Sequence, residues 1–185
     1  MKHKLVTCFE QVLVKCLQKM LVLTLLQVVF IAVGAQSVPE DHSRPQETQV
    51  RGYWVDPSTR LMWAGRDNGK DISWKKAVKY CRDLRLAGYS DWKLATLGEL
   101  ESIYDKNVEA AGLSGPDNGP STWHVKGNLF LTGYQWSSTQ RMDDRGHPDG
   151  YVWYFNFNEG RSNDDPTGWP YPFSFRRALC VRGFQ

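Results

Sequence analysis

The apolar positions of the chain first follow a strand-like spacing and then a helical one. Short apolar runs at 53–55 and 61–63 flank a turn that contains Pro57, which predicts two strands. After Ser73, a candidate N-cap, apolar residues recur three and four positions apart. They are Trp74, Ala77, Val78, Cys81 and Leu84. Basic side chains fall on the opposite side, so the pattern predicts an amphipathic helix with a solvated basic face.

A second, shorter helix is predicted where Thr96 and Glu99 form the capping-box pattern Thr-x-x-Glu. Its apolar stripe consists of Leu97, Leu100, Ile103 and Tyr104. Between the two helices, Trp92 and Leu94 are expected in a strand or a turn of the core.

The second half of the chain alternates between strand-like runs and breaker-rich segments. Aromatic and β-branched residues predict strands at 134–138, 151–157 and 178–182. Glycine, proline and polar residues predict loops at 108–133, 141–150 and 161–172. Strands, then two helices, then strands with long loops make up an α+β order.

Residues 1–35 have the features of a signal peptide. A basic start precedes the apolar run 20–33, which is short for a membrane span of roughly 20 residues. Small residues at 33–35 predict cleavage before Gln36, and retention of the leader as an anchor is the alternative. Residues 36–49 are polar and predict a flexible linker, so the folded domain is expected to span 50–185.

The basic charge of the chain belongs to the leader. The whole chain has 23 Lys and Arg against 20 Asp and Glu, and the leader holds four of the bases and one of the acids. The remainder therefore has 19 of each. A net charge of zero argues against nucleic-acid binding through overall charge, and a local basic patch stays open.

Cys81 and Cys180 are the only cysteines outside the leader, which holds Cys8 and Cys16. In an exported domain such a pair predicts one disulfide, and two buried thiols are the alternative. Closing a loop of about 100 residues would stabilise the fold by up to about 4–5 kcal/mol through loop-closure entropy. All eight tryptophans also lie outside the leader, and most are expected in the core.

A set of ordered motifs carries a family likeness. They are Thr-Arg-Leu-Met-Trp at 59–63, Trp-x-x-Ala-x-x-Tyr-Cys at 74–81, the run from Leu86 to Leu100, Trp-Ser-Ser-Thr at 136–139, Trp-Tyr-Phe-Asn-Phe at 153–157 and Cys-Val-Arg-Gly at 180–183. Over about residues 50–184 the chain resembles the Lcl C-terminal domain family, which ends a collagen-like bacterial surface adhesin.

The resemblance implies a C-type lectin-like fold, with two helices packed on short antiparallel sheets and long loops. It also implies a disulfide between the first helix and the last strand, where Cys81 and Cys180 stand. Family members at the bacterial surface are associated with sulfated glycans. The chain departs from the family pattern at Ala95, where proline is usual, and in the longer loop 161–172, which weakens the transfer of a particular ligand.

Two binding chemistries are expected on the loops 139–150 and 158–173. Arginine matches sulfate through its planar fork, and an exposed indole or phenol ring stacks on sugars. Acidic residues interleaved with the arginines would weaken an anion site by forming ion pairs. The predicted contact residues are Arg141, Arg145, Arg161, Asn163, Trp169, Tyr171 and Arg176.

The same loops also contain residues that could bind a metal ion. Oxygen ligands for calcium would come from Asp143, Asp144, Asp149, Asn158, Glu159, Asn163, Asp164 and Asp165. The Glu-Pro-Asn, Gln-Pro-Asp and Trp-Asn-Asp triplets of calcium-dependent lectins do not occur in the sequence. The histidines outside the leader lack the paired spacing of zinc sites. We expect no metal and no cofactor.

The predicted function is exported, non-catalytic glycan binding, with anionic glycans included, in the periplasm, at the cell surface or in the medium. The alternative is protein–protein contact, as a structural module of an envelope assembly. An enzyme related to sulfatase-modifying factors is the third hypothesis, but the sequence has no G-x-S-x-G, Walker or H-E-x-x-H motif. We expect no catalytic residue, no nucleic-acid partner and no membrane span in the mature chain, and leave a homo-oligomer open.

Overall fold

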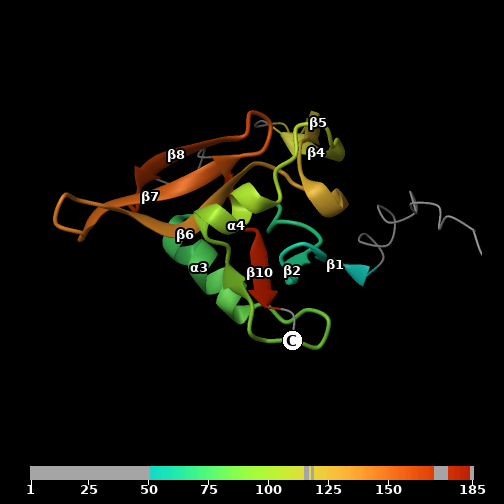
Figure 1. Ribbon diagram of the computed structural model, residues 1–185, viewed down its shortest axis with the longest axis horizontal. Helices are drawn as coiled ribbons and strands as arrows, with labels where there is room; N and C mark the ends of the chain where they lie inside the picture. The colour runs from blue at the N-terminus through green and yellow to red at the C-terminus, as the bar shows by residue number, and fades with distance from the viewer. Residues whose placement is uncertain (1–50, 115–116, 118, 169–174, 184–185) are drawn as a thin grey trace, which may run out of the picture. The chain divides into compact units, whose positions relative to one another are not determined.

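The structure is a computed structural model that describes residues 51–114, 117, 119–168 and 175–183 (Figure 1). These residues form three β-sheets, two α-helices and one 3-10 turn. The predicted leader and linker lie outside the described residues. Neither helix of the described part has the length and apolar character needed to cross a membrane.

The first sheet joins the beginning of the domain to its end. It has the strand order β1-β2-β10-β3, and all its pairs are antiparallel. The strands are β1 (Tyr53–Val55), β2 (Leu61–Ala64), β10 (Cys180–Gly183) and β3 (Lys93–Leu94). The predicted hairpin is thereby confirmed, and Asp56 closes its turn by accepting hydrogen bonds from the hydroxyls of Ser58 and Thr59.

Both predicted helices are present. Helix α3 (Trp74–Asp83) starts after Ser73, although the serine side chain makes no cap bond, and it buries Ala77 and Cys81. Helix α4 (Leu97–Ser102) is only six residues long. Its capping box is complete, because Thr96 accepts a bond from the backbone of Glu99 and the Glu99 carboxylate accepts one in return.

The remaining strands form a hairpin and a second four-stranded sheet. Strands β4 (Ala110–Ser114) and β5 (Gly119–Trp123) pair with each other, and the turn η1 (Lys126–Asn128) follows. The larger sheet has the order β8-β7-β6-β9. Its strands are β6 (Tyr134–Met142), β7 (Pro148–Asn156), β8 (Arg161–Pro166) and β9 (Arg176–Arg177), of which β9 runs parallel to β6.

The core consists of two clusters of buried side chains. One contains Trp63, Trp123 and Phe155, and the other contains Trp92, Trp136 and the two cysteines. Cys81 of α3 and Cys180 of β10 form a disulfide, with their Cα atoms 5.3 Å apart. The predicted bridge between the first helix and the last strand is therefore confirmed.

The expected α+β fold of C-type lectin-like kind, with two helices packed on short sheets, is wrong. The described residues are mainly β-structure, with ten strands and only 16 residues in the two α-helices. Three segments predicted as loops contain strands: 110–114 with 119–123, the ends of β6 and β7 within 141–150, and 161–166. These segments have a low intrinsic β-propensity, but pairing with a neighbouring strand supplies their backbone hydrogen bonds.

Glycine permits one of these unexpected strands. A Cβ atom at Gly112 of β4 would lie 2.2 Å from the carbonyl oxygen of Leu131 and 2.6 Å from the Trp123 ring. Only a residue without a side chain fits between them, so the same glycine that argues against a strand in the sequence is required for this one.

Candidate functional site

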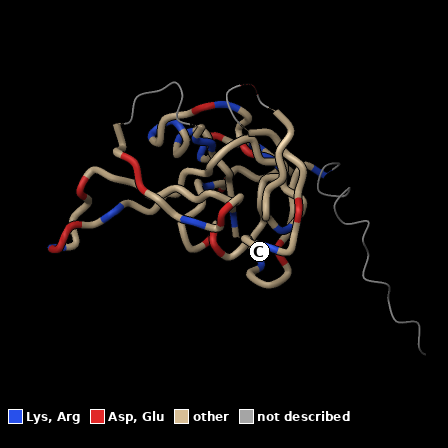
Figure 2. The backbone as a smooth tube through the Cα atoms, turned by 90° about the horizontal axis from the view of Figure 1, so that it is seen from above, with Lys and Arg blue, Asp and Glu red and all other residues tan. Residues whose placement is uncertain are grey.

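The outer parts of β6, β7 and β8, residues 139–153 and 161–166, form an extended projection that we call the arm. In Figure 1 the arm extends to the left of the domain, with β8 beside β7, and Figure 2 shows the same projection at the left. The β6–β7 pairing has register shifts around Gln140, which are typical of β-bulges. The predicted contact loops 139–150 and 158–173 thus become largely strands, as far as the structure describes them.

Arg141 is the centre of a charged cluster on the arm. Its Nε donates to Asp149 Oδ2 at 2.6 Å, and its Nη1 donates to Asp164 Oδ2 at 2.5 Å. The guanidinium carbon lies 3.9 Å from the centre of the Tyr151 ring. The hydrogen bond to Asp149 raises the pKa of Arg141. Two carboxylates and a ring therefore fix a side chain that is 37% exposed.

The same face of the arm continues into β7 and β8. Trp153 stands directly opposite Asp164, and Tyr151 opposite Pro166, and cross-strand partners share one face of a sheet. Both rings are half-buried. The face thus presents fixed hydrogen-bond donors and acceptors next to two aromatic rings.

The other predicted contact residues lie in different surroundings. Arg145 is exposed in the turn after β6, and Arg161 and Asn163 are exposed on the edge strand β8. Among the described residues neither Arg145 nor Arg161 makes an ion pair. Trp169 and Tyr171 lie outside the described residues, so their predicted roles are not tested.

Arg176 is buried, with 8% of its surface exposed. Its guanidinium lies 3.5 Å from the centre of the Tyr154 ring and pairs with Asp165 at 2.8 Å. The rings of Tyr134 and Trp136 are also close. This environment is that of a packing residue, and contact between Arg176 and a ligand stays a prediction.

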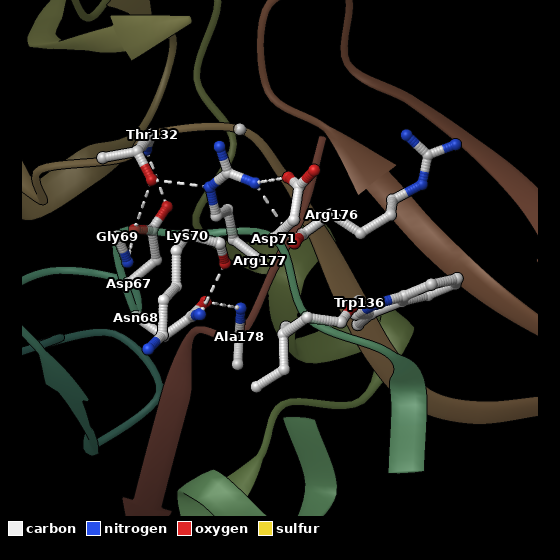
Figure 3. A network of polar contacts seen from close by, with 12 residues as sticks. Asp67, Asn68, Gly69, Lys70, Asp71, Thr132, Trp136, Arg176, Arg177 and Ala178 are labelled. Atoms are coloured by element: carbon white, nitrogen blue, oxygen red, sulfur yellow. Dashed lines mark hydrogen bonds and ion pairs between the residues drawn. The ribbon is translucent and has the colours of Figure 1, made fainter. Parts of the chain in front are cut away.

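A buried polar network was not predicted from the sequence (Figure 3). Asp67 accepts hydrogen bonds from the backbone and hydroxyl of Thr132 at 2.7 and 2.8 Å, and from the Gln135 amide at 2.9 Å. Arg177 donates to the Thr132 hydroxyl at 2.8 Å and pairs with Asp71. Burial raises the pKa of Asp67 above its ordinary value. The network connects the segment before α3 to β6 and β9.

The proposed calcium ligands of the arm are largely engaged with other groups. Asp149 and Asp164 hold Arg141, Asp165 holds Arg176, and Asp143 accepts the backbone N–H groups of residues 145 and 147. Over the part of the chain that the structure describes, no three His, Cys, Asp or Glu side chains gather closely enough to hold a metal ion.

A shallow depression of about 390 Å³ lies on the exposed side of α3. Tyr80 and Leu84 supply its apolar lining, and charged residues surround them. The complete lining is Lys76, Lys79, Tyr80, Asp83, Leu84 and Arg85. Burial raises the pKa of the Tyr80 hydroxyl. The basic face predicted for this helix is present.

One comparison with known proteins identifies a family. The family model described as the Lcl C-terminal domain matches residues 52–177. No curated protein matches the chain.

Proposed function

The chain belongs to the Lcl C-terminal domain family, and on that premise we propose that it is an exported, adhesin-like, non-catalytic domain that binds a glycan through the arm. The Cys81–Cys180 disulfide supports export, because such bonds persist in oxidising compartments. It also argues against an enzyme of the sulfatase-modifying kind, since that chemistry needs reactive cysteines.

The observation that carries the proposal is the cluster of Arg141 with Asp149, Asp164 and Tyr151. A sugar presents neighbouring hydroxyl groups, each of which both donates and accepts hydrogen bonds. The cluster offers a guanidinium and two carboxylates already held in place, so little side-chain entropy is lost when a ligand binds. The half-buried rings of Tyr151 and Trp153 add apolar surface for the C–H side of a sugar.

The charge of the arm favours a neutral glycan over a polyanion. Residues 139–153 and 161–166 contain five carboxylates, at 143, 144, 149, 164 and 165, against arginines at 141, 145 and 161. The best-placed of these arginines is already paired twice. A sulfated ligand would have to displace these carboxylates and would meet their repulsion.

A glycan array tests the proposal with the purified protein, the variant Arg141→Gln and the matched control Arg161→Gln, which lies on the opposite face of β8 from Asp164 and away from the Arg141 cluster. We expect binding to neutral glycans that survives both a chelator and roughly 0.5 M salt, a concentration at which surface charge contacts are largely screened. The binding should be lost in Arg141→Gln and unchanged in Arg161→Gln.

Three other outcomes would contradict this proposal, and each would indicate a different kind of site or partner. Binding confined to sulfated glycans and abolished by salt would contradict the arm as the site. Binding lost with chelator would indicate calcium. Failure to bind any glycan would favour the alternative, contact with an envelope protein.

A further inference from the structure

Trp153 has different surroundings from the other tryptophans of the described residues. Each of the others belongs to a core cluster or packs against one: Trp54, Trp63, Trp74, Trp92, Trp123 and Trp136. Trp153, on strand β7, is part of neither cluster and is half-buried. Packing in the core therefore does not account for this ring, and an amphipathic ring of this kind is typical of a contact surface.

The indole N–H of Trp153 is open to solvent. Within the described residues it donates to no acceptor, and it is not among the buried polar atoms that lack a partner. Three other indoles donate to backbone carbonyls, namely those of Trp74, Trp92 and Trp136. Trp153 thus offers a ligand both apolar ring surface and a free hydrogen-bond donor.

Two polar groups beside this ring are only partly used. Asp164 stands opposite Trp153 and accepts the bond from Arg141 through Oδ2. In the part of the chain that the structure describes, Asp164 Oδ1 and Arg141 Nη2 have no hydrogen-bond partner. This acceptor and this donor lie close together, because their side chains are bonded to each other. Two neighbouring hydroxyl groups match them, since one can donate to the carboxylate and the next can accept from the guanidinium.

The second ring on this face, Tyr151, is already covered on one side. The guanidinium carbon of Arg141 lies 3.9 Å from the centre of the ring, so the phenol holds the arginine in place. Trp153 is therefore the one ring of the face, among the described residues, that no other side chain covers in this way. A site that follows a polysaccharide chain needs stacking surface for successive sugars, whereas one free ring accommodates one sugar.

We propose that the arm recognises a single pyranose at the non-reducing end of a glycan. The sugar stacks on Trp153, and two of its neighbouring hydroxyl groups bond to Asp164 and Arg141. A terminal sugar keeps all its hydroxyl groups, whereas an interior sugar has lost at least one to a linkage. This inference rests on the proposed function, because it names the class of glycan that the same site binds.

Competition with single sugars on the glycan array tests the inference. The probes are the methyl glycosides of galactose, glucose, mannose and N-acetylglucosamine, used at up to about 50 mM because one stacked sugar binds with a Kd on the order of 1 mM. We expect at least one of them to displace the protein from the array. Its 3-deoxy derivative should fail, because the 3-hydroxyl belongs to every vicinal pair that such a sugar can present.

The ring itself is tested with Trp153→Ala and the control Tyr80→Ala, which removes a 37% exposed ring on α3. We expect glycan binding to weaken about tenfold or more in the first variant and to stay unchanged in the second. Circular dichroism establishes that both variants are folded. In the wild type, the indole N–H signal of Trp153 in a ¹H–¹⁵N spectrum should shift as the competing glycoside is added, which gives a second measurement that needs no variant.

The failure of this inference is distinct from the failure of the proposed function. Suppose that glycans bind and that Arg141→Gln abolishes the binding. If no methyl glycoside competes, or if Trp153→Ala binds like the wild type, the proposed function stands and the single terminal sugar on Trp153 is wrong. If no glycan binds at all, the proposed function fails, and this inference fails with it.

Discussion

Two clusters of arginine and aspartate have nearly the same chemistry but different surroundings. On the arm, Arg141 pairs with Asp149 and Asp164 and is 37% exposed. In the polar network, Arg177 pairs with Asp71 and the Thr132 hydroxyl, and its side chain is 4% exposed (Figure 3). Water can replace the partners of the first arginine and not those of the second. Burial rather than hydrogen-bond number therefore decides which cluster stabilises the fold.

The largest effect is expected from Arg177→Met. The change removes the buried guanidinium from the half-buried Asp71 and the buried Thr132 hydroxyl, and removing one partner of a buried ion pair typically costs about 3 kcal/mol or more. We expect the free energy of unfolding in urea to fall by that amount, with an unchanged m-value. Arg145→Met, in the exposed turn of the arm, is the control. Equal stability of the two variants would show that the buried network contributes nothing to the fold.

Asp67→Asn tests the centre of the same network. The new amide brings N–H donors toward the Thr132 backbone and the Gln135 amide, which are donors themselves, so about 2 kcal/mol of stability should be lost at neutral pH.

The pH dependence of that loss has a definite sign. The pKa of Asp67 in the folded chain lies above the ordinary 3.8, because burial opposes ionisation. Its contribution to stability is therefore greatest below pH 3.8 and decreases as the pH rises through the folded pKa. The amide introduced by Asp67→Asn does not titrate, so the stability gap between wild type and variant should narrow from acid to neutral pH. Urea titrations from roughly pH 3.5 to pH 7 measure the gap, and a gap that widens would contradict this account.

Arg176→Met should have an intermediate effect. Arg176 is buried like Arg177, but its main contact is the face of the Tyr154 ring, against which a methionine side chain also packs. The pair with Asp165 is lost, and we expect a decrease of about 1–2 kcal/mol in the free energy of unfolding. A loss as large as that of Arg177→Met would mean that the ring contributes little to holding this arginine.

The elements with a local signal could be predicted from the sequence. Helix α3 follows from its apolar spacing, α4 from its Thr96–Glu99 capping box, and β7 from its aromatic run. Strand β8 could not be predicted, because its Ser, Asn and Asp residues are poor strand formers and only pairing with β7 makes it a strand. Together with β4, β5 and the outer ends of β6 and β7, this missed strand makes the described residues mainly β-structure, which is why the predicted fold class was wrong.

The candidate site residues divide in the same way, into those with a local sequence signal and those that only the fold brings together. Arg141 was singled out because arginines gather in the last third of the chain, and interleaved aspartates indicated ion pairs. The network was missed because its members are far apart in sequence: Thr132 and Gln135 follow Asp67 by 65 and 68 residues, and Arg177 follows Asp71 by 106. A polar Asp-Asn-Gly segment at 67–69 is typical of a surface turn, and nothing local shows that its first residue is buried.

The smallest effect on stability is expected from Arg141→Gln, and it separates the two clusters most clearly. Water replaces the partner that Asp149 and Asp164 lose, so the free energy of unfolding should fall by no more than the roughly 1 kcal/mol of an exposed ion pair. The pKa of Asp149 should nevertheless change. Burial of this carboxyl raises its pKa, but hydrogen bonds from Arg141 and the Tyr151 N–H outweigh the burial, and the net shift is downward.

Removing Arg141 takes away one of those hydrogen bonds, so the pKa of Asp149 should rise in Arg141→Gln. An NMR titration of the Asp149 carboxyl carbon measures the change, and Asp164→Asn is the control that leaves the Arg141–Asp149 bond in place. If the pKa rises while the unfolding energy falls by far less than in Arg177→Met, the arm cluster is an electrostatic arrangement free to serve a ligand. If Arg141→Gln destabilised the fold as strongly as Arg177→Met, exposure would not distinguish the two arginines, and the arm would be part of the structural framework.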